Sequence, residues 1–212
     1  MISYSTRTTS RLLLAAAPVT GLVPTRKVPQ AMNHRIAPVT LAFFSAIAVA
    51  QDRPRSANEQ LIRMVNAYRV EQGLKPVASS PSLTQVAVDH VKDLERMPPG
   101  GQCNNHSWSS AGKWTSCCYT ADHAQARCMW DKPREITGGA YRANGYEIAH
   151  HGTGGVTPEG ALRGWKNSSG HNSVMVNQGK WADAHWQAIG AAVSEHYAVV
   201  WFGKEADPAT GR

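Results

Sequence analysis

Acidic residues are missing from the first fifty positions of this sequence, which hold five of its 22 lysines and arginines. The formal net charge of +7 therefore depends largely on this segment, since 17 basic and 15 acidic residues remain once those five are set aside. Residues 51–212 are thus nearly neutral and lack the excess of positive charge that binding to a phosphate backbone requires. The composition argues against nucleic acid as a partner.

Several motifs that carry well-known chemistry are also missing. The sequence contains no Gly-x-Ser-x-Gly elbow, no phosphate-binding loop and no His-Glu-x-x-His helix. These absences argue against the common serine hydrolases, nucleotide-binding proteins and zinc peptidases. No Cys-x-x-Cys pair is present either, which disfavours a structural zinc site.

What the first fifty residues do contain is a short leader. The basic start Met32-Asn33-His34-Arg35 precedes an apolar run over 36–50 that ends in Ala48-Val49-Ala50. The run is too short to span a bilayer comfortably, and its small-x-small ending is typical of a signal peptide over 32–50, with Gln51 as the first mature residue. An uncleaved membrane anchor is the alternative. Residues 1–31 are interpreted as a non-native upstream extension with Met32 as the true start, or as a transit peptide.

The four cysteines lie close together in the sequence. Cys103, Cys117, Cys118 and Cys128 form an even, clustered set, which in an exported chain predicts two disulfide bonds. A bond between the adjacent Cys117 and Cys118 would strain the backbone. Two pairings remain open: Cys103 with Cys117 and Cys118 with Cys128, or the crossed arrangement.

Periodicity predicts helices early in the chain and strands late. Apolar side chains at helical spacing begin after Ser56 or Asn58 and stop before Gly73, and a second helical stripe follows Ser80. A helix is expected from Thr157, and strands are expected over 145–150, 188–194 and 197–202. The segment 98–144 is expected to be irregular. This order indicates an α+β fold rather than alternating α/β.

Five segments resemble, in order, those of one known family. They are Leu61-Ile62-Arg63-Met64-Val65-Asn66-Ala67-Tyr68-Arg69 with the following Gly73 and Pro76, Ser82-Leu83 with Ala87, Asn105-His106-Ser107, Gly145-Tyr146-Glu147-Ile148-Ala149, and Gly164-Trp165-Lys166-Asn167-Ser168-Ser169-Gly170-His171-Asn172. Together they are similar to the CAP superfamily of cysteine-rich secretory proteins, of the bacterial type. The resemblance covers 56–203, and residues 204–212 are expected to form a flexible tail.

The resemblance implies a three-layer α–β–α sandwich with a mostly antiparallel central sheet. It also implies a cleft that holds His106, Glu147 and His171. Ser168 and Trp108 are expected as neighbours of this pocket. Many animal relatives carry a second glutamate where this chain has Ser168. The chain keeps only three of the four cleft residues, which puts a mechanism based on all four in doubt.

The implied cleft residues allow two kinds of chemistry. Two imidazoles with Glu147 could hold a divalent ion such as Zn²⁺, or the carboxylate could orient a histidine. The alternative is a hydrogen-bonded network that serves only the fold. His90 lies on the apolar face of the second helix and is interpreted as a hydrogen-bonded core residue, whereas His150 and His151 are expected to be solvated loop residues.

The expected function is that of a binding module that is secreted or periplasmic. Its extracellular ligand would be a lipid, a glycan or another envelope component, and no membrane anchor would remain after cleavage of the leader. The alternative is a metal-assisted, peptidase-like hydrolase of extracellular polymers in which Glu147 would be the catalytic group.

Overall fold

The computed structural model describes Gly21 and residues 56–210. The predicted signal peptide over 32–50, its cleavage before Gln51 and the start at Met32 all lie outside the described residues. Within the described ranges, no helix is both long enough and apolar enough to cross a membrane.

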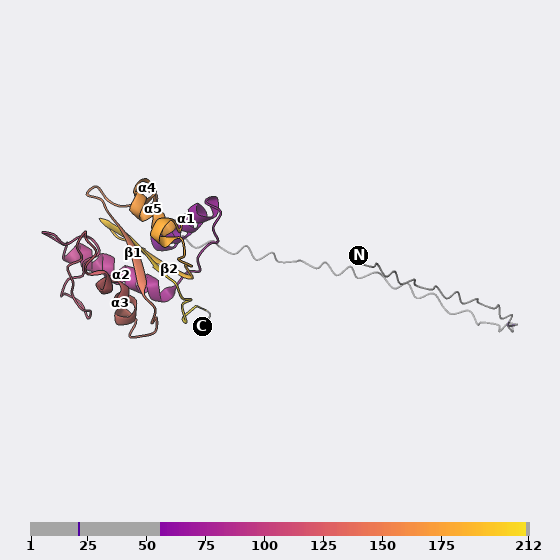
Figure 1. The fold of residues 1–212 in the computed structure, drawn as a ribbon, viewed down its shortest axis with the longest axis horizontal. Helices are drawn as coiled ribbons and strands as arrows, with labels where there is room; N and C mark the ends of the chain where they lie inside the picture. Colours follow the sequence, from indigo (N-terminus) through magenta and orange to yellow (C-terminus); the bar gives the residue numbers. More distant parts are fainter. Residues whose placement is uncertain (1–20, 22–55, 211–212) are drawn as a thin grey trace, which may run out of the picture. The chain divides into compact units, whose positions relative to one another are not determined.

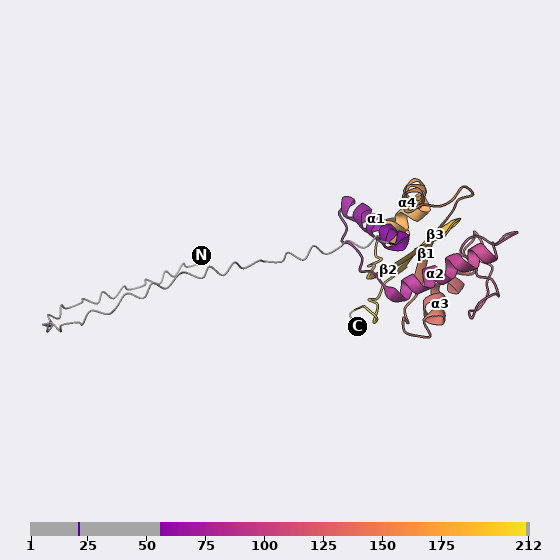
Figure 2. The same cartoon turned by 180° about the vertical axis from the view of Figure 1, so that it is seen from behind.

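Helices cover both faces of one small sheet (Figures 1 and 2). The first helical layer contains α1 (Ala57–Glu71), α4 (Pro158–Asn167) and α5 (Ser169–Met175), and the second contains α2 (Pro81–Arg96) and α3 (Ala126–Ile136). Between them lie β1 (Gly145–His151), β2 (Ala188–Val193) and β3 (Tyr197–Gly203), with a 3-10 turn, η1 (Gly179–Trp181), after α5. The predicted α–β–α sandwich is confirmed.

The sheet is antiparallel with the order β1-β3-β2, so β3 is central and β1 lies at an edge. Successive side chains of a strand point to opposite faces, and both faces are buried here. Ala198, Val200 and Phe202 of β3 face the layer of α1 and α4. Tyr197, Val199 and Trp201 face the layer of α2 and α3. The molecule therefore has two hydrophobic cores separated by the sheet.

Side-chain caps begin the helices where the sequence predicts. Ser56 and Glu59 form a capping box on α1, and Thr157 accepts a hydrogen bond from the Gly160 N–H at the start of α4. Ser80 caps α2 through the Leu83 N–H, and its hydroxyl donates to Asp207. Asp207 is buried and also accepts from the N–H of Ser82. The chain after β3, expected as a flexible tail, is thus fastened to α2 at residue 207.

Helix α3 differs from the irregular segment expected over 98–144. Its first turn has no side-chain cap, since Gln125 makes no capping hydrogen bond, and Pro133 lies inside it. Met129 is nevertheless buried in the second core. Tertiary packing rather than local sequence preference therefore forms this helix.

The disulfide bonds have the crossed pairing, Cys103 with Cys118 and Cys117 with Cys128, and no cysteine in the described ranges is free. Cys117 pairs with Trp108 as an isolated antiparallel bridge, with backbone hydrogen bonds in both directions. Adjacent residues of extended chain point to opposite sides. The bridge therefore turns Cys117 and Cys118 toward different partners.

Candidate functional site

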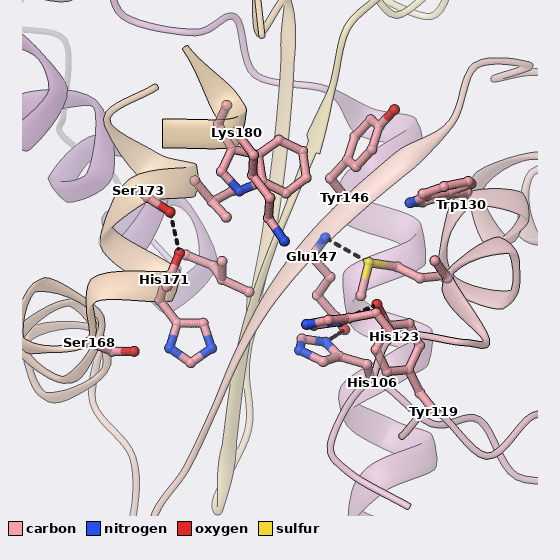
Figure 3. A pocket seen from close by; sticks show the side chains of 16 residues that line it. His106, Tyr119, His123, Trp130, Tyr146, Glu147, Ser168, His171, Ser173 and Lys180 are labelled. Carbon is pink, nitrogen blue, oxygen red and sulfur yellow. Dashed lines mark hydrogen bonds and ion pairs between the residues drawn. The ribbon is translucent and has the colours of Figure 1, made fainter. Parts of the chain in front are cut away.

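A cavity of about 280 Å³ lies at the free edge of β1, between the two helical layers (Figure 3). One wall comes from α3 and from the loop over 97–125 that precedes it, called here the cysteine loop. The floor comes from β1, and the other wall from α5 and η1. The lining residues are His106, Tyr119, His123, Ala126, Met129, Trp130, Tyr146, Glu147, Ile148, Ser168, Gly170, His171, Ser173, Val174, Lys180 and Trp181. Apolar and aromatic side chains dominate, with a few polar groups among them.

Glu147 is the most buried polar group at this cavity. It lies on β1 opposite Trp201 of β3, so its side chain points into the layer of α2 and α3. Its carboxyl group is fully buried, with Oε1 2.5 Å from His90 Nδ1 and Oε2 2.8 Å from His106 Nδ1. Both oxygens are engaged by imidazoles. These contacts place Glu147 where it can orient His106.

The same contacts control the ionisation of Glu147. Burial alone would raise the pKa of this carboxyl group, but the charge of His90 and the hydrogen bonds from His106 and His90 outweigh it and hold the pKa below its ordinary value. A carboxyl group whose pKa is lower in the folded than in the unfolded protein stabilises the fold above its unfolded pKa. That stability is lost as the pH falls through the folded pKa.

His106 is held in the cysteine loop by local hydrogen bonds. Its backbone N–H donates to Asn104 Oδ1 at 3.0 Å, and the Asn104 N–H donates to the Tyr119 carbonyl at 2.8 Å. The ring of Tyr119 meets the His106 ring edge-on, with 5.3 Å between centroids. The disulfide of Cys118, next to Tyr119 in sequence, ties down the same part of the loop. The imidazole is therefore fixed by backbone, aromatic and covalent contacts.

His171 comes from α5 on the opposite wall, and its ring points across the cavity toward His106 (Figure 3). Burial lowers the pKa of His171, and the nearby His106 and His150 lower it further. The neutral ring, which is the form that binds metals, is thus favoured. No three His, Cys, Asp or Glu side chains in the described part of the chain converge closely enough to hold a metal ion.

The other cleft residues named from the sequence have separate positions. Ser168 lines the cavity at the junction of α4 and α5. Trp108 does not line it; the indole is 2% exposed and stacks on His90 behind Glu147. It packs in the second core with Trp114. Trp108 therefore supports the site from within the protein.

Two histidines expected in a solvated loop lie on β1. His150 packs near Trp165 and the backbone of Gly164, where a Cβ atom would lie 3.0 Å from the imidazole. Burial lowers the pKa of His150, with His151 adding to the effect. His151 is exposed on the other face, against Tyr197. The two rings point to opposite faces, so they do not form a joint site.

Sequence reasoning did not connect His90 with the site. The prediction that it is a hydrogen-bonded core residue is confirmed, because both ring nitrogens have partners, Glu147 and the Ser107 carbonyl. Its link to Glu147 depends on the packing of α2 against the sheet, which no local pattern reveals. Tyr119, His123, Tyr146 and Lys180 were not predicted as cavity residues either. The one available signal in the sequence was the position of His90, a polar residue on the apolar face of a predicted helix.

The first-helix motif that carries the resemblance has a structural role. Asn66 donates to the Val77 carbonyl and accepts from the Val77 N–H, which fixes the chain leading to α2. The buried guanidinium of Arg69 bonds to the Met175 carbonyl and to Asn177 Oδ1, just beyond α5. This motif therefore anchors the segment that carries His171.

The solved structures that match this chain include three bacterial proteins. An extracellular protein containing an SCP domain from Bacillus anthracis str. Ames has 16% identity and a TM-score of 0.49 over 70% of this chain and 40% of its own. A cysteine-rich secretory protein from Staphylococcus aureus subsp. aureus Mu50 has 14% identity and a TM-score of 0.45, over 70% of this chain and 39% of its own. An outer surface protein from Borrelia burgdorferi has 16% identity and a TM-score of 0.47, over 69% of this chain and 91% of its own.

The matched region spans less than half the length of the first two structures. Comparison with curated proteins gave no match. The model of the cysteine-rich secretory protein family matches residues 62–198, which is more than half of the 212 residues. The chain therefore belongs to the cysteine-rich secretory protein, or CAP, family.

Proposed function

We propose that this domain is a binding module whose cavity takes a small, largely apolar ligand. The observation that carries the proposal is the composition of the cavity wall, where Met129, Trp130, Ile148, Val174 and Trp181 surround a volume of about 280 Å³. Small-molecule sites are typically concave and apolar, with a few polar groups that fix orientation. A lipid or an apolar part of an envelope component suits such a wall.

The polar end of the cavity suits a divalent ion such as Zn²⁺. Imidazole nitrogens are ordinary zinc ligands, and His106 and His171 supply two of them from opposite walls. Glu147 bonds to the Nδ1 of His106, the usual arrangement of a carboxylate behind a metal-binding histidine. The residues fit an ion held by two histidines, with the remaining positions left to water or ligand. Such an ion would polarise a ligand oxygen.

The compartment in which the domain acts is part of the same proposal. Two disulfide bonds in one domain are typical of proteins that fold in an oxidising compartment. The leader predicted over 32–50 would deliver the chain there. We propose that the mature domain acts as a secreted or periplasmic protein.

Replacing both His106 and His171 with alanine is expected to abolish zinc binding measured by calorimetry, because both proposed ligands are removed. His106 is only partly buried and His171 lies at the cavity wall, so the fold should persist. The matched control is His151→Ala, an exposed histidine of the same sheet outside the cavity. Unchanged zinc affinity in the double variant would refute the two-histidine site. Native mass spectrometry of protein from its own host would test the apolar ligand separately.

Ser168→Glu is expected to tighten zinc binding by roughly tenfold, or about 1.4 kcal/mol. Ser168 lines the cavity, so a carboxylate there would add an oxygen ligand beside the two imidazoles. Ser169→Glu adds the same charge one residue later at an exposed position outside the cavity wall, and serves as the control. Equal gains in the two variants would show that general electrostatics, not ligation, produces the effect.

Metal-assisted hydrolysis is the second candidate, and one observation favours it. The Nδ1 of His106 is bonded to a buried carboxylate, as in a general base whose other nitrogen faces substrate. Among the described residues no serine or cysteine side chain is hydrogen-bonded to His106, so in this mechanism the ring would activate a water molecule. Peptide or ester turnover that His106→Ala eliminates, with ligand binding retained, would support this alternative over the binding module.

A further inference from the structure

Two further hollows adjoin the cavity at the end of the sheet where β1 begins and β3 ends. One, of about 290 Å³, is lined by Arg127, Trp130, Asp131, Arg134 and Asn144. The other, of about 320 Å³, is lined by Arg142, Ala143, Asn144, Tyr146, Lys204 and Glu205. The two share Asn144, and each shares one aromatic residue, Trp130 or Tyr146, with the cavity. Together they form a groove continuous with the cavity, called here the basic groove.

Positive side chains outnumber negative ones along the basic groove. Five exposed cationic residues stand in it or at the adjoining wall of the cavity: Arg127, Arg134, Arg142, Lys180 and Lys204. The acidic residues that line the groove are Asp131 and Glu205. Asp131 pairs with Arg134 at 3.2 Å, whereas Arg142 and both lysines form no ion pair with any residue in the described ranges. The groove therefore offers cations that an anionic ligand could neutralise.

Aromatic rings lie where the basic groove meets the cavity. The ring centroids of Trp130 and Tyr146 are 6.3 Å apart, and those of Tyr146 and Trp181 are 5.4 Å apart. All three side chains are only partly buried, and Figure 3 shows Trp130 and Tyr146 at the same end of the cavity. The ammonium of Lys204 is 5.4 Å from the centroid of Tyr146, and that of Lys180 is 5.5 Å from the centroid of Trp181. Rings and cations thus stand next to each other.

This combination suits a chain of acidic sugars. The apolar face of a sugar ring packs against an aromatic ring, and an anionic substituent accepts charge-assisted hydrogen bonds from arginine and lysine. We propose that the basic groove binds an acidic polysaccharide, whose sugar rings pack on Trp130 and Tyr146 and whose anionic groups bind Arg142 and Lys204. The proposal goes beyond the small apolar ligand of the cavity and does not require the cavity to be occupied.

Other anionic partners fit the basic groove less well. A membrane-binding surface usually inserts apolar side chains, but the large hydrophobic residues that are exposed in the described ranges, Val70 and Met97, do not line the groove. An acidic peptide would use the cations but leave the faces of the aromatic rings without a partner. A nucleic acid carries a phosphate at every nucleotide, whereas the groove has acidic side chains among its cations.

Binding of oligogalacturonate, an acidic oligosaccharide with a carboxylate on each sugar, tests the proposal in the full chain. A chelator keeps zinc from bridging the probe to the cavity. We expect binding that weakens as salt is raised, and an affinity at least about tenfold lower for the methyl ester, which has the same sugars without the charges. Failure to bind oligogalacturonate would overturn the proposal. An equal affinity for polyglutamate would do so in favour of an acidic peptide, and binding only to phosphatidylglycerol vesicles in favour of a membrane.

Charge reversal locates the site. Arg142→Glu combined with Lys204→Glu is expected to lower the affinity for oligogalacturonate by at least about tenfold, because both substituted residues line the basic groove. The matched control, Arg163→Glu with Lys166→Glu, makes the same change of net charge at exposed positions of α4 outside the groove. Equal losses in the two variants would show that net charge, not the groove, attracts the probe.

The outcome is separable from that of the proposed metal site. Arg142 and Lys204 lie outside the cavity wall, so zinc affinity should be the same in the charge-reversed variant as in the unsubstituted chain. Lost oligogalacturonate binding with retained zinc binding would support two separate sites. A chain that binds zinc but not oligogalacturonate would overturn the basic groove alone, and a chain that binds oligogalacturonate but not zinc would leave it standing.

Discussion

Replacing Glu147 with alanine is expected to lower the free energy of unfolding by about 3–5 kcal/mol, the range found when one partner of a buried ion pair is removed. The change would leave His90 fully buried without its carboxylate, and would release the Nδ1–H of His106. Urea unfolding followed by far-ultraviolet circular dichroism measures the effect.

Glu147→Gln is the matched variant for this prediction. The amide keeps the volume and can bond one histidine through its oxygen, but it removes the charge. Its loss of stability is expected to lie between those of the unsubstituted protein and Glu147→Ala. Equal stability of all three proteins would show that the buried carboxylate does not support the fold.

Trp201→Ala is expected to destabilise the domain by a similar amount, about 3–5 kcal/mol, through the large cavity left in the core. Trp201 is fully buried on central strand β3 and meets the rings of His90 and Trp108 edge-on. The lost volume would lie beside the imidazole that contacts Glu147. Thermal unfolding followed by near-ultraviolet circular dichroism reports both the stability and the aromatic packing.

Trp130→Ala is the comparison for this second prediction. Trp130 is only partly buried and lines the cavity, so its loss leaves space that water can enter. We expect a clearly smaller loss of stability but a weaker affinity for an apolar ligand. A larger destabilisation from Trp130→Ala than from Trp201→Ala would contradict the assignment of Trp201 to the core and Trp130 to the binding surface.

Much of the framework could be predicted because its causes are local. Ser56, Ser80 and Thr157 each begin a helix with a side-chain cap next to an apolar stripe. The late strands have the β-branched and aromatic residues of buried sheet, and the structure places them at 188–193 and 197–203. Capping and periodicity act within a few residues, so they are visible in the sequence.

The unpredicted features depend on contacts between distant residues. Helix α3 has no capping side chain, and burial of Met129 against the second core compensates. The choice between the two cysteine pairings depends on the bridge between Trp108 and Cys117, nine positions apart. The carboxyl group of Glu147 is bonded to His90, 57 residues earlier in the chain. Only the resemblance of separate segments to one family indicated that His106, Glu147 and His171 belong to one site.

The crossed disulfides make the order of assembly matter. In an unfolded chain Cys117 and Cys118 are chemically equivalent neighbours, so an oxidant acting at that stage would join Cys103 or Cys128 to either one. In the folded domain Trp108 is paired with Cys117, and the two sulfurs face separate partners. Folding of this loop therefore selects the bonds, and the bonds then preserve the wall that carries His106. Such a chain needs an environment that exchanges disulfides as well as forms them, so that early mispairing can be undone.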